Sequence, residues 1–310
     1  MMMKKILTVA AFLLLCFGAL AQNSKEEFLS RYVMLVNKLG YDGVGVETLI
    51  NKWEEAYPDD VEMLCAKFNY YFVKSQKHEV VAKSQEKFLG AAPLLSLKDS
   101  TGAKVNYFDE IMYDDDLYAK ASSSLDRAIR LKENDASLRF SRINALLAYE
   151  KESPDMATQA LNSLIDYNCI SHPAWTWGNG TAFSDEDFVS QIIDCCFVLF
   201  KSGSPATMEA FRAVTEKMYS YYPKNTDVLN NLGSYYLVAK KDSKNALKYY
   251  GKTLKIDPDN YAAIKNCIIL SRRDNNIKQE KKYLAKLIAV TPDETEKTAS
   301  QVRLEALNKK

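Results

Sequence analysis

Three prolines recur at nearly equal intervals in the C-terminal third of this chain. Pro223, Pro258 and Pro292 are 35 and then 34 residues apart. Between the first two, apolar and small residues recur with the period of a helix, on one segment at Leu229, Leu232, Gly233 and Tyr236 and on the next at Ala246, Tyr250 and Thr253. A repeat of this length cannot bury its apolar face alone, so neighbouring repeats must stack into a continuous core.

The residues that fill this repeat carry a family resemblance. Gly233 and Ala246 are small where two helix backbones must approach, and Pro258 ends the second helix because it has no N–H to donate. With Leu232 and Tyr250 at their places, the segment resembles the tetratricopeptide repeat (TPR) family. The resemblance implies an all-α fold, a right-handed superhelix of helix pairs, which holds a protein or peptide partner in a concave groove. It implies neither catalysis nor a cofactor.

The first residues resemble an export signal. Two lysines are followed by an almost wholly apolar run over 6–18 and by the cleavage site Ala19-Leu20-Ala21. The sequence therefore predicts a signal peptide over 1–21 and a periplasmic protein. Cys16 raises the alternative of a lipid anchor, which Leu15 disfavours because bacterial lipoproteins have a small residue at that place. No later stretch approaches the roughly 20 apolar residues of a membrane span.

The rest of the chain divides by pattern into four further segments. We expect a divergent TPR-like helical part at 22–90, a β-hairpin or loop insertion at 91–116, divergent helical repeats at 117–222, and TPR repeats with a closing helix at 223–310. The hairpin is expected near 94–107, because residues alternate on both sides of the turn sequence Asp99-Ser100-Thr101-Gly102. The acidic run 114–116 is expected to open a helix, since a calcium loop needs spaced ligands.

Local signals place several helix ends. Ser184 with Asp187 three residues later predicts a capping box, and Ser204-Pro205 predicts an N-cap followed by proline at the first helical position. The closing helix at 293–308 is expected to bury a thin stripe of Ala299, Val302 and Ala306. Glu280 departs from the family pattern, which has alanine there.

The resemblance also transfers a set of partner-contacting positions, which lie along the first helix of each repeat. They are Asp227, Asn230, Ser234 and Leu237 in one repeat, and Lys265, Asn266, Arg272 and Arg273 in the next. Ile269 falls at the same set of positions but is expected in the core because it is apolar. For each of the others, a solvated helix face with no partner remains the alternative.

Charge is distributed unevenly along the chain. Residues 223–310 contain 18 Lys and Arg against 10 Asp and Glu, whereas residues 22–222 contain 21 against 30. This polarity can steer an acidic protein or peptide, as the unidentified partner, toward the basic end. The alternative is that these charges are solvated helix faces with no partner. Nucleic acid is not indicated, because basic and acidic residues nearly balance over the whole chain, at 41 and 40.

A second candidate site is the loop at 171–180, which is rich in glycine and proline. His172, Trp175, Trp177 and Asn179 could bind a glycan or another small ligand, because flat tryptophan rings stack on sugars and asparagine supplies hydrogen bonds. The alternative is that the tryptophans fill the core between helix pairs. No catalytic or metal site is predicted, since the chain lacks the G-x-S-x-G and H-E-x-x-H motifs and has two histidines in all.

Five cysteines follow the predicted signal, an odd number that cannot pair completely within one chain. They lie in or beside apolar helical runs, which favours buried thiols over a disulfide framework. The neighbouring Cys195 and Cys196 lack the C-x-x-C spacing of a redox pair.

A narrower resemblance rests on three features: the export signal, the run Phe68-Asn69-Tyr70-Tyr71-Phe72, and the Trp-x-Trp loop. Together they resemble exported TPR proteins of Bacteroidetes-type bacteria. That resemblance implies no activity.

Overall fold

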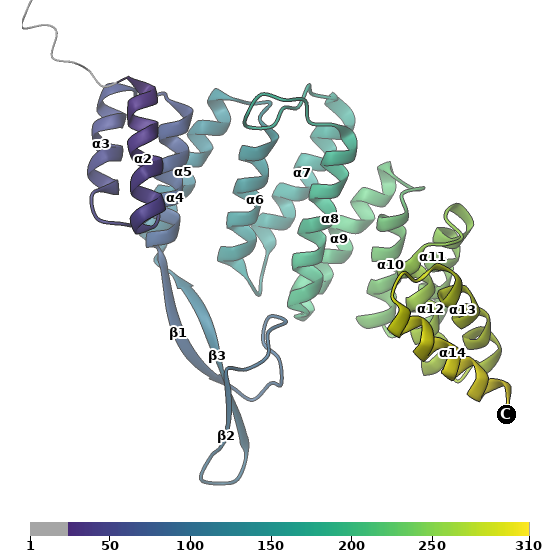
Figure 1. The fold of residues 1–310 in the computed structure, drawn as a ribbon. Coiled ribbons are helices and arrows are strands. Elements are labelled where there is room, and N and C mark those ends of the chain that lie inside the picture. Colours follow the sequence, from purple (N-terminus) through teal and green to yellow (C-terminus); the bar gives the residue numbers. More distant parts are fainter. Residues whose placement is uncertain (1–23, 310) are drawn as a thin grey trace, which may run out of the picture. The chain divides into compact units, whose positions relative to one another are not determined.

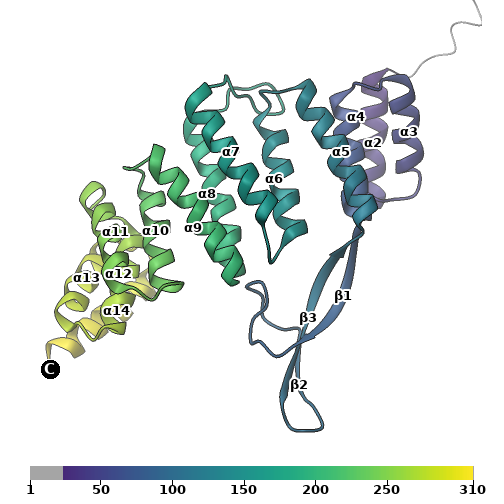
Figure 2. The ribbon, with the colours of Figure 1, turned by 180° about the vertical axis from the view of Figure 1, so that it is seen from behind.

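The computed structural model describes residues 24–309, so the predicted signal peptide lies outside the described residues (Figures 1 and 2). The chain forms two compact units. The first, here called the N-terminal unit, comprises the described residues up to Val80 together with Asp109–Leu138. The second, the C-terminal unit, comprises Val81–Phe108 and the chain from Arg139 onward.

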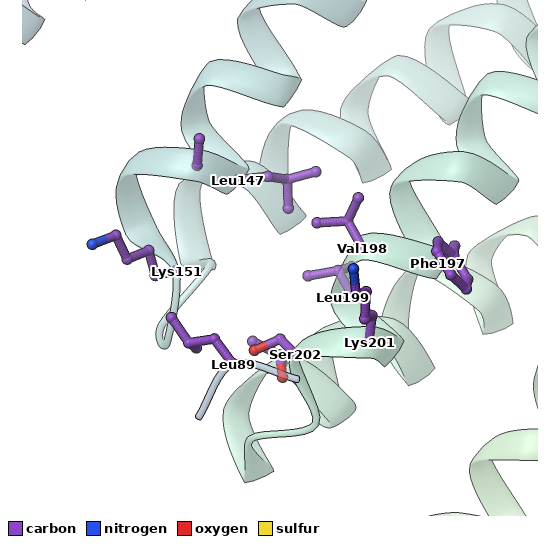
Figure 3. A pocket seen from close by; sticks show the side chains of 10 residues that line it. Leu89, Leu147, Lys151, Phe197, Val198, Leu199, Lys201 and Ser202 are labelled. Carbon is purple, nitrogen blue, oxygen red and sulfur yellow. The ribbon is translucent and has the colours of Figure 1, made fainter. Parts of the chain in front are cut away.

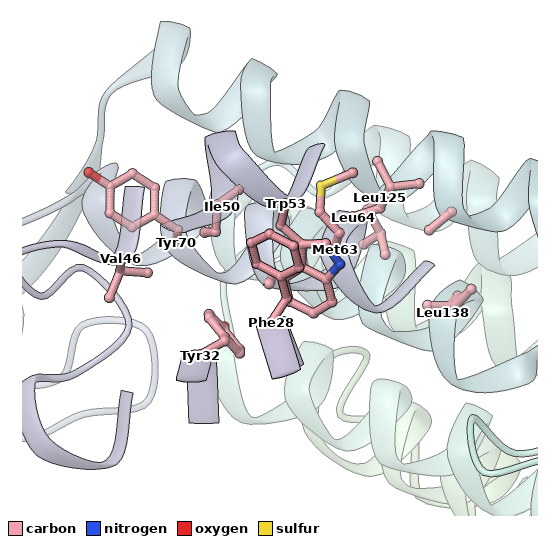
Figure 4. Close-up of a cluster of buried hydrophobic side chains, with 12 residues drawn as sticks. Phe28, Tyr32, Val46, Ile50, Trp53, Met63, Leu64, Tyr70, Leu125 and Leu138 are labelled. Carbon is pink, nitrogen blue, oxygen red and sulfur yellow. The ribbon is translucent and has the colours of Figure 1, made fainter. Parts of the chain in front are cut away.

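The N-terminal unit is built from four helices packed around aromatic side chains. The helices are α2 (Lys25–Leu39), α3 (Val46–Ala56), α4 (Val61–Lys74) and α5 (Asp115–Leu131). The Phe28 and Trp53 rings stack with their centroids 5.8 Å apart (Figure 4). The Trp53 indole N–H donates to the buried carboxylate of Asp60 at 2.9 Å, which satisfies both groups away from water. Burial raises the pKa of that carboxyl group.

Three strands form an insertion between α4 and α5. They are β1 (Gln76–Lys83), β2 (Leu95–Lys98) and β3 (Lys104–Tyr113), in the sheet order β1-β3-β2. The predicted hairpin is confirmed: β2 and β3 pair antiparallel, with Leu95 opposite Tyr107 and Lys98 opposite Lys104. In the turn, the Asp99 carboxylate accepts from the backbone N–H groups of Thr101 and Ala103.

The prediction that the N-terminal part is helical as far as residue 90 was wrong after Lys74, where α4 ends. The chain enters strand β1 at Gln76, and the sheet order places β1 beside β3. Because the two strands are more than 20 residues apart in the sequence, no turn signal announces their pairing. The β insertion therefore begins earlier than the pattern suggested.

The C-terminal unit continues as an array of helices. In order they are α6 (Ala136–Glu150, whose first three residues belong to the N-terminal unit), α7 (Asp155–Ser171), α8 (Asp185–Ser202), α9 (Pro205–Tyr221), α10 (Thr226–Val238), α11 (Ser243–Ile256), α12 (Tyr261–Arg273), α13 (Ile277–Val290) and α14 (Glu294–Asn308). The capping box of Ser184 with Asp187 and the N-cap at Ser204 are both present. From α8 onward each helix packs against its neighbours in sequence. The fold is a TPR-like helical array with a small β insertion.

Helices α10 and α11 pack closely at Gly233. A Cβ atom added there would lie 2.5 Å from Cε1 of Tyr250, a side chain that is fully buried. Tyr250 also shares a hydrogen bond of 3.1 Å with the Ser234 hydroxyl. The predicted small residue at the helix crossing is confirmed, and the ring of Tyr250 occupies the space that it leaves.

The closing helix α14 packs with a different face from the one predicted. Ala299, Val302 and Ala306 are exposed, Val302 by 61%, whereas Ser300 and Leu307 are buried. Leu307 joins the cluster of Ile264, Ile268, Leu284 and Leu287. A leucine buries more apolar area than alanine, so the helix turns its leucine face inward.

We predict that Gly233→Ala destabilises the protein by about 2 kcal/mol, because the methyl group must push the buried Tyr250 ring aside. Gly251 in α11 is the matched control, since a Cβ atom there meets nothing within 4 Å. Gly251→Ala should stabilise by up to about 1 kcal/mol through helix propensity. Urea unfolding of both variants measures the two changes, and equal midpoints would contradict the close crossing.

Candidate functional site

The first helices of the C-terminal repeats lie side by side and parallel. Near their starts, the Asn230 side chain of α10 donates to Asn260, the N-cap of α12, at 3.0 Å. Near their ends, the Arg273 guanidinium of α12 donates to the backbone carbonyl of Leu237 in α10, also at 3.0 Å. These two contacts hold α10 and α12 in a fixed register, so their outward faces form one surface.

The next first helix, α14, is joined to α12 in the same way. At the starts, Glu296 accepts from Tyr261 at 2.8 Å and pairs with Lys265 at 2.8 Å. At the ends, Arg272 of α12 and Arg303 of α14 both donate to Glu280, at 2.7 and 2.9 Å. Polar contacts therefore connect three successive first helices at both ends.

Glu280 is the residue that stands where the family pattern has alanine. Its side chain is only 3% exposed, and both arginines contact its carboxylate. Hydrogen bonding from Arg303 lowers the pKa of Glu280 below its usual value. Partial burial acts in the opposite direction, and the hydrogen bond from Arg272 lowers the pKa further. The departure from the family pattern thus has a structural role, because it links the closing helix to the repeat before it.

Each basic residue that was predicted to contact a binding partner already forms an ion pair or hydrogen bond within the chain. Lys265 pairs with Glu296, Arg272 with Glu280, and Arg273 with Leu237 and the Ser243 hydroxyl. An acidic ligand would have to compete with these contacts. We infer that the main role of the three cations is to position the helices.

The other predicted contact residues divide into exposed and buried positions. Asp227 is exposed, and Ser234 and Asn266 are half-buried, whereas Asn230 and Leu237 are buried. The mapping of Asn230 and Leu237 to an accessible groove was wrong, because α10 turns both toward neighbouring helices, Asn230 to the N-cap of α12 and Leu237 into a cluster with Ala263 and Cys267 of that helix.

Ile269 was expected in the core and is instead 50% exposed. It lies on the outward face of α12, one turn beyond Asn266. Val238 at the end of α10 was not predicted as a contact residue, and it is 51% exposed. An apolar residue at the last turn of a helix gives no periodicity signal of its own, so only the structure shows that Val238 faces outward.

The two tryptophans of the loop at 171–180 differ in burial, because Trp175 lies in the core and Trp177 packs at its surface. Trp175 is buried, its indole N–H donates to Asn168 at 2.8 Å, and its ring forms a T-shaped pair with Tyr167. Trp177 is half-buried and packs edge to face on Phe183, with the ring centroids 4.5 Å apart. Asn168 also donates to Asp185 and to Tyr222, so the network joins α7, α8 and the end of α9.

The two polar residues of that loop support the backbone. His172 ends α7 in the left-handed conformation, with φ of 46°, and its N–H donates to the carbonyl of Asn168. Asn179 accepts from the N–H and the hydroxyl of Thr181 across a turn. The predicted ligand residues therefore have structural partners, and Trp175 is the core-filling residue of the alternative interpretation.

The described residues offer no group of metal ligands, and their neighbouring pair of cysteines is buried. No group of three or more His, Cys, Asp and Glu side chains is placed to hold a metal ion within residues 24–309. The Asp114 side chain caps α5 by accepting from Leu117, which agrees with the helix-opening interpretation of the acidic run. The five cysteines of the described chain are free. Burial raises the pKa of both Cys195 and Cys196 to about 12, which disfavours the thiolate form that reacts.

Comparison with known proteins gives distant structural likenesses. No family model and no curated protein matches the chain. A solved structure from the functional characterisation of PilF of Pseudomonas aeruginosa is 10% identical, with a TM-score of 0.37 over 90% of this chain and 96% of the other. A flexible tandem repeat domain of bacterial cellulose synthase is 14% identical, with a TM-score of 0.26 over 94% and 98%. The assignment of the fold therefore rests on the repeat geometry described above.

We predict that Glu280→Gln destabilises the protein by about 2 kcal/mol, because Arg272 and Arg303 both pair with the buried negative charge of Glu280 and the substitution removes it. Glu305→Gln, an exposed position of α14, is the matched control and should leave stability within about 0.5 kcal/mol of the original. Chemical unfolding at pH 7 measures both. A Glu280→Gln variant as stable as the control would show that the link between α12, α13 and α14 contributes nothing.

We also predict a specific dependence of stability on pH. Hydrogen bonding from Lys265, followed by that from Thr291, lowers the pKa of Glu296 from 4.5 to about 2. A carboxylate with a lowered pKa in the folded state stabilises the fold above pH 4.5 and loses that contribution as the pH falls toward 2. Glu296→Gln should therefore have a lower melting midpoint at pH 7, and the difference should shrink as the pH falls through this range. A constant difference at every pH would contradict the ion pair.

Proposed function

We propose that this protein is a TPR-like scaffold that binds a segment of another protein on the outward face of α10 and α12. The observation that carries the proposal is the pair Val238 and Ile269, which are about half exposed on two neighbouring, parallel helices. An apolar side chain held on a rigid surface is available to a partner without an ordering cost at the moment of binding.

Polar groups beside the apolar pair suit the backbone of an extended peptide. Asn231 and Asn266 lie one turn before Ser234 and Ile269 on their helices, and both are half-buried. The Asn231 side-chain nitrogen is buried and has no hydrogen-bond partner within the described chain. An amide can donate to a peptide carbonyl and accept from a peptide N–H, which favours a backbone that crosses the two helices.

Charge acts on this proposed partner at long range. Since Lys265, Arg272 and Arg273 have internal contacts, the basic surplus of residues 223–310 would guide an acidic partner to the surface without forming direct ion pairs first. The proposal involves no catalysis, cofactor or nucleic acid. A glycan site at Trp175 and Trp177 is less favoured, because the Trp175 ring is buried and its N–H is bonded to Asn168.

We further propose that the protein acts in the periplasm after export. The support is the sequence pattern of residues 1–21 and the resemblance to exported TPR proteins of Bacteroidetes-type bacteria. In the described chain, none of the helices has the length and apolar content needed to cross a membrane.

A photo-crosslinking residue tests the proposed surface. It is placed at Val238 or Ile269 and, as the matched control, at Ile256 of α11, which is 49% exposed and lies on a second helix of the array. In native cells we expect one partner to crosslink at 238 and 269 and not at 256. Ile269→Glu should abolish that product and Ile256→Glu should not. A product of equal yield at all three positions would contradict a specific site on this face.

A further inference from the structure

A pocket of about 340 Å³ opens within the C-terminal unit, away from α10 and α12 (Figure 3). Its walls come from the ends of α6 and α8 and from a turn of the β insertion, which contribute Leu147, Val198 and Leu89. The volume lies at the lower end of the range found for small-molecule sites. Apolar side chains make up most of the lining, with lysines and a serine among them.

The turn that forms one wall has an unfavourable backbone. Phe88 and Ala91 exchange two backbone hydrogen bonds across Leu89 and Gly90, which both have positive φ, at 48° and 76°. Turns of this kind strongly prefer Asn-Gly, because a leucine strains the left-handed conformation. Gly90 is required for a second reason: a Cβ atom there would lie 2.2 Å from the backbone oxygen of Lys201. The chain thus accepts strain at Leu89 in a turn pressed against the end of α8, as residues at binding sites often do.

The polar groups of the pocket favour an anion. Lys151 and Lys201 line it, and none of the ten lining residues is acidic. The hydroxyl oxygen of Ser202, another lining residue, is buried and has no hydrogen-bond partner within the described chain. A buried hydroxyl without a partner costs free energy, and an oxygen of a ligand would satisfy it.

We propose that this pocket binds a small amphipathic monocarboxylate. Its apolar chain lies against Leu89, Leu147 and Val198, and its carboxylate accepts from the Ser202 hydroxyl and pairs with the Lys201 ammonium group. At about 30 Å³ for each water-sized group, the volume holds a ligand of roughly ten non-hydrogen atoms. The site shares no residue with the peptide-binding face proposed above, so either proposal can fail without the other.

Calorimetry of the purified protein with octanoate tests the proposal. Octanamide, which has the same shape without the charge, and acetate, which lacks the chain, are the ligand controls. We expect octanoate to bind about tenfold more tightly than octanamide, and acetate not to bind measurably. Absence of octanoate binding, or equal binding of octanoate and octanamide, would overturn the proposal.

Two variants assign the binding to this pocket. Leu89→Asn removes the apolar wall but supplies the residue that the turn prefers, so the protein should remain folded while octanoate binding weakens about tenfold. Leu94→Asn, at an exposed leucine of the same insertion, is its matched control and should bind like the original. Lys201→Met should remove the preference for octanoate over octanamide, and Lys244→Met, an exposed lysine of α11, should not. Unchanged octanoate binding in both pocket variants would contradict this site.

Discussion

The close approach of α10 and α11 at Gly233 sets the position of the helices that follow them. The Tyr250 ring lies against the glycine backbone and joins Leu237 and Ala246 to Ala263 and Cys267 of α12 in one cluster. Leu254 and Tyr283 contact this cluster and also the next, which contains Leu284, Leu287 and Leu307. Each repeat therefore completes the core of its neighbour, and one glycine determines how near the first pair can come.

Polar contacts stabilise the helix array together with this apolar core. The apolar clusters pack first helices against second helices and also join α10 to α12, while ion pairs and hydrogen bonds connect successive first helices at their two ends. Glu280 and Glu296 are central to the second arrangement, since each accepts from groups of neighbouring elements. Between the two ends, the outward face keeps Ile269 accessible, with Val238 beside the Arg273 contact. A surface held at both ends and open between them is suited to binding an extended segment without movement of the helices, although the buried Asn231 amide must turn outward to reach the segment.

Local chemistry in the sequence predicted much of the fold. Capping residues such as Ser184, the regular prolines and the turn at Asp99 act within a few residues of their own position, so their structural effect can be predicted without knowledge of the fold. Strand β1 could not be predicted, because its partner is contributed by a distant segment. The prediction of the buried face of α14 was also wrong. The helix carries both an alanine stripe and a leucine stripe, and packing against the neighbouring helix determines which of them is buried.

The candidate site was less predictable than the fold. A shift of one residue turns a side chain by about 100° around a helix, so Asn230 is buried while Asn231 beside it faces outward to a greater degree. The sequence predicted the basic residues as contact positions, but their charge alone does not reveal that Glu296 and Glu280 form ion pairs with Lys265 and Arg272. Long-range pairing thus changed the interpretation of Lys265 and Arg272 from partner contacts to contacts that position helices.

We propose that an apolar, prealigned face, rather than free cations, recognises the partner. Selection of peptides from a random display library on the purified protein tests this proposal. We expect selected peptides with two apolar anchors, whose affinity changes little between low and high salt and is lost in Ile269→Glu but kept in Ile256→Glu. Selection of acid-rich peptides whose binding disappears at high salt, and which bind both variants equally, would contradict it.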